Sequence, residues 1–147
     1  MKSFSTENYV STQELESIVG TAGICRWPDT EPFWHERVEK AVAPDTKIDC
    51  TVYPNTQEEL AAVIAWAGRN HWGVLPCGSG SKLDWGGLVK EVKIAVSTGH
   101  LNRLVEHAVG DLTVTAEAGM KFADLQEILG KAGQFLPIDP AYPQQAT

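Results

Sequence analysis

The most constraining feature of this sequence is a strand, a helix and a second strand that follow one another within residues 48–75. Residues 48–52 alternate apolar and polar side chains, which indicates a strand. Thr56 and Glu59 have the spacing of a capping box, and an apolar stripe at helical spacing follows them. Residues 74–75 form the second strand. The strands of such a unit run parallel with a right-handed crossover, so we expect an α/β fold.

The rest of the chain divides into a lead-in, residues 1–45, and a main part, residues 46–147. We expect helices at 11–19 (with Ser11 and Glu14 as a capping box), 32–43 and 122–132, strands at 92–96 and 112–116, and a helical turn at 100–104. Glycines are predicted to end these elements, at Gly20, Gly73, Gly119 and Gly133. Three prolines in residues 135–147 predict an irregular C-terminal segment.

Composition excludes several classes of function. The net charge of −7 gives no basic stripe for nucleic acid. The three cysteines are odd in number and form no CxxC pair, and the histidines lack metal-ligand spacing, so we expect neither disulfides nor a metal site. The sequence has no apolar run long enough for a membrane span and no signal peptide. These features predict a reduced, cytoplasmic protein.

The segment with most chemical information is the glycine loop that follows the second strand of the unit, Leu75-Pro76-Cys77-Gly78-Ser79-Gly80-Ser81-Lys82-Leu83. Ligands of such sheets bind beyond the carboxyl ends of the strands. Gly78 and Gly80 permit positive φ and a close approach of the backbone. Successive N–H groups can then form a nest for an anion, with hydroxyls and Lys82 as further donors. This chemistry suits a pyrophosphate.

The common nucleotide-binding motifs do not fit this loop. A GxGxxG motif requires glycine at position 83, where Leu83 stands, and it opens a helix after the first strand rather than the second. The Gly-Lys-Ser/Thr of a P-loop is also absent. From spacing alone, a plain Gly/Ser turn remains an equal alternative. Cys77, beside the nest, could have a lowered pKa and a redox role, although a role in loop structure is the favoured interpretation.

Four segments in order resemble the FAD-binding domain of the PCMH type, found in the vanillyl-alcohol oxidase family. They are residues 52–60, the loop with Trp85-Gly86-Gly87, residues 110–119, and residues 136–140 with Ala146-Thr147. The resemblance covers residues 48–147. Within the family, the phrases at 78–87 and 136–140 resemble in particular the FAD-binding subunit of bacterial glycolate oxidase.

The resemblance implies a fold, a cofactor and a reaction. The fold would be the first lobe of a PCMH-type domain, a small parallel sheet with flanking helices (α/β, or α+β). The backbone of Gly78, Ser79, Gly80 and Ser81 would bind the FAD pyrophosphate. Pro76 and Cys77 would shape the loop's entry, Lys82 and Leu83 its exit, and Pro140 and Thr147 would lie near the ribityl chain or flavin ring. Ser81 stands where some relatives attach FAD through histidine, so FAD would be non-covalent.

The resemblance further implies oxidation of a 2-hydroxy acid such as glycolate or D-lactate, with partner chains such as an iron–sulfur subunit. The family continues beyond the Ala-Thr segment, so we expect a truncated domain, with no catalytic residue assigned and an exposed apolar patch that a complementary flavoenzyme chain would cover. The alternative is a non-catalytic fragment that binds a partner or nothing.

Overall fold

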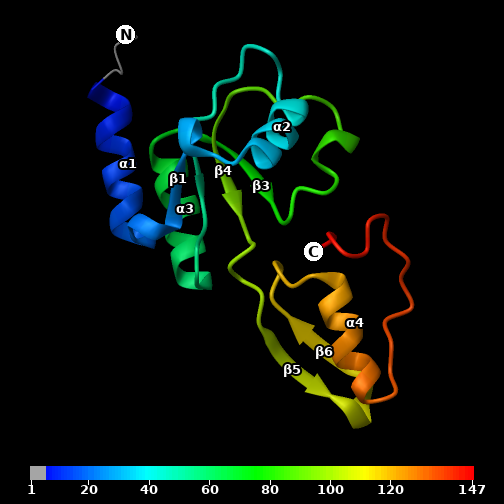
Figure 1. Cartoon of the computed structure of the whole chain (residues 1–147). Coiled ribbons are helices and arrows are strands. Elements are labelled where there is room, and N and C mark those ends of the chain that lie inside the picture. Colours follow the sequence, from blue (N-terminus) through cyan, green and yellow to red (C-terminus); the bar gives the residue numbers. More distant parts are fainter. Residues whose placement is uncertain (1–5) are drawn as a thin grey trace.

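The computed structural model describes residues 6–147, with side chains from residue 12 onward. Its larger sheet has the order β1 (Ile24–Arg26), β2 (Cys50–Val52), β4 (Val92–Ser97), β3 (Gly73–Cys77) (Figure 1). β2 and β3 both run parallel to β4, which lies between them. The expected α/β fold with a small parallel sheet is therefore confirmed. β1, which the sequence analysis missed, adds an antiparallel edge to β2 and makes the sheet mixed.

Helices cover both faces of this sheet. α1 (Thr6–Val19) and α3 (Gln57–Arg69) pack on one face, and α2 (Pro32–Ala41) packs on the other. The first core contains Leu15, Val19, Cys50, Val52, Val63, Trp66, Ala67, Ile94 and Val96. The second contains Val38, Val42, Ile48, Leu75, Cys77, Val92 and Ala95. Packing on both faces explains why every residue of β4 except Lys93 is buried. Although the division at residue 45 stays a prediction, α1, β1 and α2 pack directly on the main part.

A second, smaller unit follows β4. β5 (Leu104–Ala108) and β6 (Thr113–Ala116) form an antiparallel hairpin, and α4 (Phe122–Lys131) lies beside it (Figure 1). Gln134, just after α4, joins the helix to the hairpin: its side chain bonds His107 Nε2 at 2.8 Å and donates to the carbonyl of Val109 at 2.7 Å. The C-terminal residues then return towards the larger sheet without regular structure, as predicted.

Several element boundaries differ from the sequence predictions. α1 begins at Thr6, so Ser11 lies within the helix and does not cap it. α3 ends at Arg69 rather than near Gly73, because His71 takes a left-handed φ of +56°, and the N–H groups of His71 and Trp72 bond back to the carbonyls of Gly68 and Ala67. Gly73 instead opens β3. The predicted helical turn at 100–104 is wrong, since residue 104 already begins β5.

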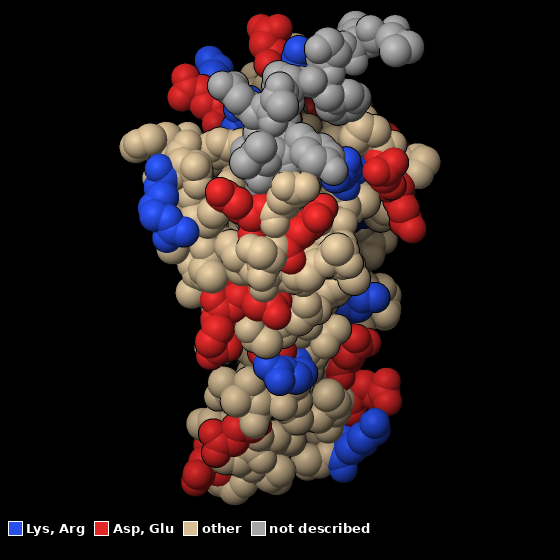
Figure 2. All heavy atoms as spheres, turned by 90° about the vertical axis from the view of Figure 1, so that its left-hand side faces the viewer, with Lys and Arg blue, Asp and Glu red and all other residues tan. Residues whose placement is uncertain are grey.

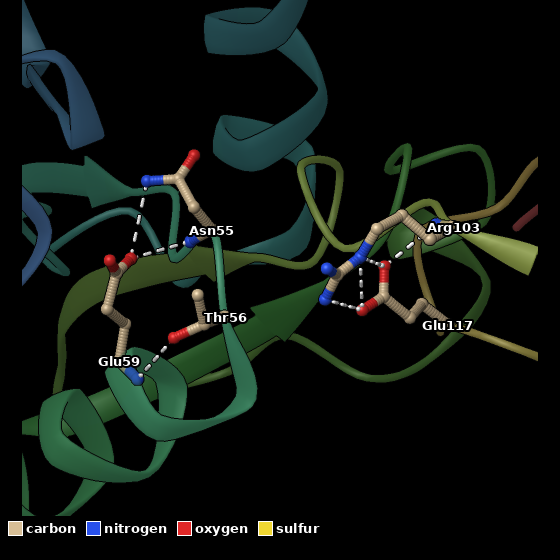
Figure 3. A network of polar contacts seen from close by, with 5 residues as sticks. All are labelled: Asn55, Thr56, Glu59, Arg103 and Glu117. Atoms are coloured by element: carbon tan, nitrogen blue, oxygen red, sulfur yellow. Dashed lines mark hydrogen bonds and ion pairs between the residues drawn. The ribbon is translucent and has the colours of Figure 1, made fainter. Parts of the chain in front are cut away.

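Gly20 and Gly133 end their helices as predicted. Each takes a positive φ, +75° and +68°. The capping box at the start of α3 is also confirmed, with one shift. Glu59 N–H donates to Thr56 Oγ1 at 3.1 Å, but the Glu59 carboxylate accepts from the N–H of Asn55 rather than from that of Thr56 (Figure 3).

An ion pair joins the residue before β5 to the residue after β6, at the base of the hairpin. Glu117, whose side chain is only 3% exposed, accepts from the guanidinium of Arg103 (2.6 Å) and from its backbone N–H (2.8 Å) (Figure 3). The Glu117 N–H donates in return to the carbonyl of Arg103. These bonds stabilise the charged carboxylate and hold the pKa of Glu117 below its ordinary value.

This ion pair predicts a pH-dependent contribution to stability. A carboxyl whose pKa is depressed by folding stabilises the fold above its unfolded pKa and loses that contribution as pH falls through the folded value. In urea unfolding, wild type should exceed Glu117→Gln in stability near neutral pH, and the gap should shrink steadily below about pH 4.5. The matched control is Glu127→Gln, which removes an exposed carboxylate paired with Lys131 and should barely change stability. Parallel stability curves for wild type and Glu117→Gln would contradict this assignment.

The surface is charged and mixed. On the face shown in Figure 2, acidic and basic side chains are interspersed. None of the helices between residues 6 and 147 combines the length and the apolar character that crossing a membrane would need. In the same residues no three His, Cys, Asp or Glu side chains come together in a way that could hold a metal ion.

Candidate functional site

The glycine loop lies at the carboxyl end of the parallel strands. It leaves β3, an edge strand of the sheet, and passes into a short 3₁₀ turn, Leu83–Trp85. Pro76 is tolerated in β3 because an edge strand leaves one side without ladder partners. The loop therefore stands where the sequence places it, at the end of the sheet at which ligands of α/β folds bind.

Three consecutive carbonyls of this loop are held by donors from other parts of the chain. The carbonyl of Cys77 accepts from Thr98 N–H at 2.8 Å, that of Gly78 from the Ser97 hydroxyl at 3.3 Å, and that of Ser79 from the Arg37 guanidinium at 3.0 Å. All peptide bonds of residues 6–147 are trans. In a planar trans peptide the N–H points opposite to the C=O, so each held carbonyl also sets the direction of the next N–H.

The N–H groups fixed in this way belong to Gly78, Ser79 and Gly80. Within the described chain, those of Gly78 and Gly80 take part in no hydrogen bond, and that of Ser79 makes a long one, 3.4 Å, to Thr147 Oγ1. Three successive, oriented and weakly engaged donors are the chemistry of an anion-binding nest. If the segment were only a Gly/Ser turn, nothing would require donors from elsewhere in the chain to bind all three carbonyls.

Both glycines lie close to neighbouring side chains. A Cβ on Gly78 would stand 1.8 Å from Thr147 Oγ1. Gly80 has φ +72°, and a Cβ there would stand 2.6 Å from Cζ3 of Trp34. A larger residue at Gly78 would have to displace the Thr147 side chain, and at Gly80 the positive φ and the Trp34 ring both disfavour one.

One buried polar atom in the loop has no protein partner. The hydroxyl of Ser79 is inaccessible to solvent and makes no hydrogen bond with any described residue. Leaving a buried hydroxyl unpaired costs about 1–3 kcal/mol, so such atoms in native proteins usually meet a water, an ion or a ligand. A hydroxyl without a protein partner, in the same loop as three weakly engaged N–H donors, is a candidate for binding a phosphate group.

The end of the loop borders a polar cavity of about 320 Å³. Its lining comes from α2, from the loop and the turn after it, and from the C-terminal segment: Arg37, Lys40, Gly80, Ser81, Asp84, Trp85, Tyr142 and Gln145. Lys82 donates to the Ser81 hydroxyl and its ammonium lies 5.9 Å from the centre of the Trp85 ring. Leu83 packs against the second core instead. Trp85, 62% exposed, is available at the cavity rather than buried in the core.

The pKa of the Cys77 thiol is raised, whereas the sequence suggested that it could be lowered. Its side chain is buried, its Sγ contacts the carbonyl of Val96 at 3.4 Å, and burial raises the pKa of the thiol to about 12. A thiol with so high a pKa stays protonated at neutral pH and is a poor nucleophile. Cys77 is thus a packing residue at the loop's entry.

The two predicted residues from the C-terminal segment differ in what the structure shows. Thr147 touches the loop directly, through Gly78 and Ser79. No hydrogen bond or ring contact in residues 6–147 joins Pro140 to the loop, and its place near a flavin stays a prediction. Sequence reasoning missed Arg37 and Gln145, whose side chains bond each other at 2.6 Å. Neither belongs to a recognisable motif, so only the fold could reveal them.

Comparisons with known proteins show the family to which this chain belongs. The sequence profile described as "FAD binding domain" matches residues 48–147, and the chain belongs to that family. A D-2-hydroxyglutarate dehydrogenase of Stutzerimonas stutzeri is 25% identical over 86% of this chain and 27% of its own length. The glycolate oxidase subunit GlcD of Bacillus subtilis is 25% identical over 63% of this chain and 20% of its own.

The fold has a clear counterpart among solved structures. The 4-ethylphenol oxidase of Gulosibacter chungangensis superimposes with a TM-score of 0.76 over 99% of this chain and 29% of the oxidase, at 20% identity. The expected PCMH-type fold is thereby confirmed, and FAD is the cofactor of the family. The chain spans between a fifth and about 30% of the length of these proteins.

Proposed function

We propose that this chain supplies the pyrophosphate-binding site of an FAD-dependent oxidoreductase. The observation that carries the proposal is the set of held peptides that orients the N–H groups of Gly78, Ser79 and Gly80, beside the buried unpaired hydroxyl of Ser79. In this proposal Pro76 and Cys77 set the entry to the loop. Ser81, Lys82 and Leu83 set its exit, and Pro140 and Thr147 lie towards the flavin.

The backbone N–H groups suit this task because the protein as a whole is acidic. With a net charge of −7, the overall field does not attract a diphosphate, so binding must come from local, oriented donors. Hydrogen bonds to a charged acceptor contribute about 1.5–3 kcal/mol each. FAD, when bound, would accept a hydride from the substrate. Ser81 offers no imidazole for attachment, and we propose that FAD is held non-covalently.

We propose a 2-hydroxy acid as the substrate class of the whole enzyme. The support comes from the relatives, whose names include 2-hydroxyglutarate and glycolate, although identity to each is only 25%. No described residue is assigned as general base or substrate anchor. The relatives' name "subunit" supports further chains, such as an iron–sulfur subunit, as partners. The free cysteines Cys25, Cys50 and Cys77 support a reducing compartment such as the cytoplasm.

An apolar hollow on the smaller unit supports association with a complementary polypeptide of the same flavoenzyme. The hollow encloses about 430 Å³ between the hairpin, α4 and the segment after it. Leu112 in its lining is 78% exposed and Phe135 is 71% exposed. Large apolar side chains gathered in a hollow indicate a surface that another polypeptide covers.

The proposed function is tested by asking which part of FAD the chain recognises. FAD binding to the purified chain is measured by quenching of tryptophan fluorescence, and ADP, FMN and riboflavin are added as competitors. A pyrophosphate site predicts competition by ADP and little by riboflavin at equal concentration. Competition by riboflavin but not by ADP would show that the chain holds FAD by its flavin ring and not by its pyrophosphate. No FAD binding at tens of micromolar would contradict the proposal and favour a non-catalytic fragment.

A further inference from the structure

α2 lies outside residues 48–147, the part of the chain that matches the family, and yet it contacts the glycine loop in two places. Trp34 packs against Gly80, and its indole N–H donates to Thr51 Oγ1 in β2 at 3.1 Å. Arg37, one turn further along α2, donates to the carbonyl of Ser79. α2, a part of the lead-in, therefore packs against one side of the loop.

Arg37 joins two segments that are far apart in sequence. One terminal nitrogen of its guanidinium donates to the carbonyl of Ser79 at 3.0 Å, and the other donates to Oε1 of Gln145 at 2.6 Å. The group also lies over the Phe33 ring, 4.1 Å from its centre, which fixes the side chain from below. A planar guanidinium held in this way serves two acceptors in one fixed geometry, which a lysine ammonium does not reproduce.

We propose that Arg37 is a positioning residue for the cofactor's pyrophosphate, acting through the loop rather than by touching the phosphate. Because it holds the carbonyl of Ser79, it fixes the plane of the Ser79–Gly80 peptide and thus the direction of the Gly80 N–H. Through Gln145 it also keeps Thr147 against Gly78. This inference rests on the proposed function and assigns a binding role to the lead-in.

A direct electrostatic role makes a different prediction from positioning. If Arg37 attracted the diphosphate only by its charge, lysine would retain most of the affinity. If Arg37 orients the loop, Arg37→Lys and Arg37→Met should both weaken FAD and ADP binding, each by about tenfold or more, since one oriented charge-assisted bond is lost. Arg69→Met is the matched control: it removes an exposed arginine at the end of α3 and should leave the affinity unchanged.

The experiment measures dissociation constants for FAD and ADP with wild type, the two Arg37 variants and Arg69→Met, together with the amide NMR signals of the chain without ligand. The inference predicts parallel losses for both Arg37 variants, and shifted Ser79–Ser81 and Gln145–Thr147 signals before any ligand is added. Full affinity in Arg37→Lys with loss in Arg37→Met overturns it. So do unshifted loop signals, and so does unchanged affinity in both variants. Wild type that fails to bind FAD refutes the proposed function instead, while the ligand-free signals still decide whether Arg37 orders the loop.

Discussion

Replacing Gly119 by alanine is expected to destabilise the chain by about 3 kcal/mol or more, the range of severe overpacking. A Cβ at this position would stand 1.8 Å from the carbonyl oxygen of Thr98 and 2.8 Å from that of Leu101. Both contacts are with backbone, so no rotation of a side chain relieves them. The Gly119 N–H also donates to the carbonyl of Leu101 at 2.7 Å, and this bond would be lost if the two segments moved apart.

The measurement is urea unfolding of Gly119→Ala against wild type, followed by circular dichroism. Gly130→Ala is the matched control, because a Cβ on Gly130 meets nothing within 4 Å and alanine favours the helix α4, by about 1 kcal/mol at most. We expect loss of stability in the first variant and a small gain in the second. Equal stability in Gly119→Ala and wild type would show that the two units do not pack as closely here as the structure has them.

Substitutions in the glycine loop should have the largest effect on cofactor affinity. Gly78→Ala would push Thr147 away from the loop, and Gly80→Ala would place a side chain at positive φ against Trp34. Each change displaces at least one of the oriented N–H donors. Losing one charge-assisted hydrogen bond raises the dissociation constant for FAD by about tenfold to a hundredfold, and losing two raises it further.

These affinities are measured by fluorescence titration, with Gly68→Ala as control, since a Cβ on Gly68 in α3 has open space around it. Thermal unfolding of each variant separates loss of binding from loss of fold. We expect intact folding and weakened FAD binding in both loop variants. If Gly78→Ala and Gly80→Ala bound FAD as tightly as Gly68→Ala, the loop would not be the phosphate site.

The sequence predicted the elements whose pattern is local and strong. The α3 stripe and the alternation in β4 are direct records of burial, and both were placed within a few residues. β1 and β5 were missed for a physical reason. β1 has only three residues, too few to show an alternating pattern. β5 has half-buried and exposed side chains throughout. Their pairing comes from tertiary partners rather than from a pattern of their own.

The candidate site likewise has one part that the sequence predicts and another that only the folded structure shows. The glycines and serines of the loop could be predicted because they are consecutive in sequence and their chemistry is that of a nest. The groups that hold the loop, Arg37, Ser97 and Thr98, come from other elements and meet it only in the folded chain. No spacing rule connects residue 37 to residue 79, so this part of the site needed a structure.

The central claim, that the loop's backbone N–H groups bind a pyrophosphate, is tested most directly by NMR titration of the ¹⁵N-labelled chain with ADP. We expect the amide signals of Gly78, Ser79 and Gly80 to move downfield together, with half of the full change at the ADP dissociation constant obtained from competition with FAD. Signals from the exposed Gly110, distant in sequence from the loop, should stay in place. Saturable ADP binding that leaves the three loop amides unmoved would contradict the claim.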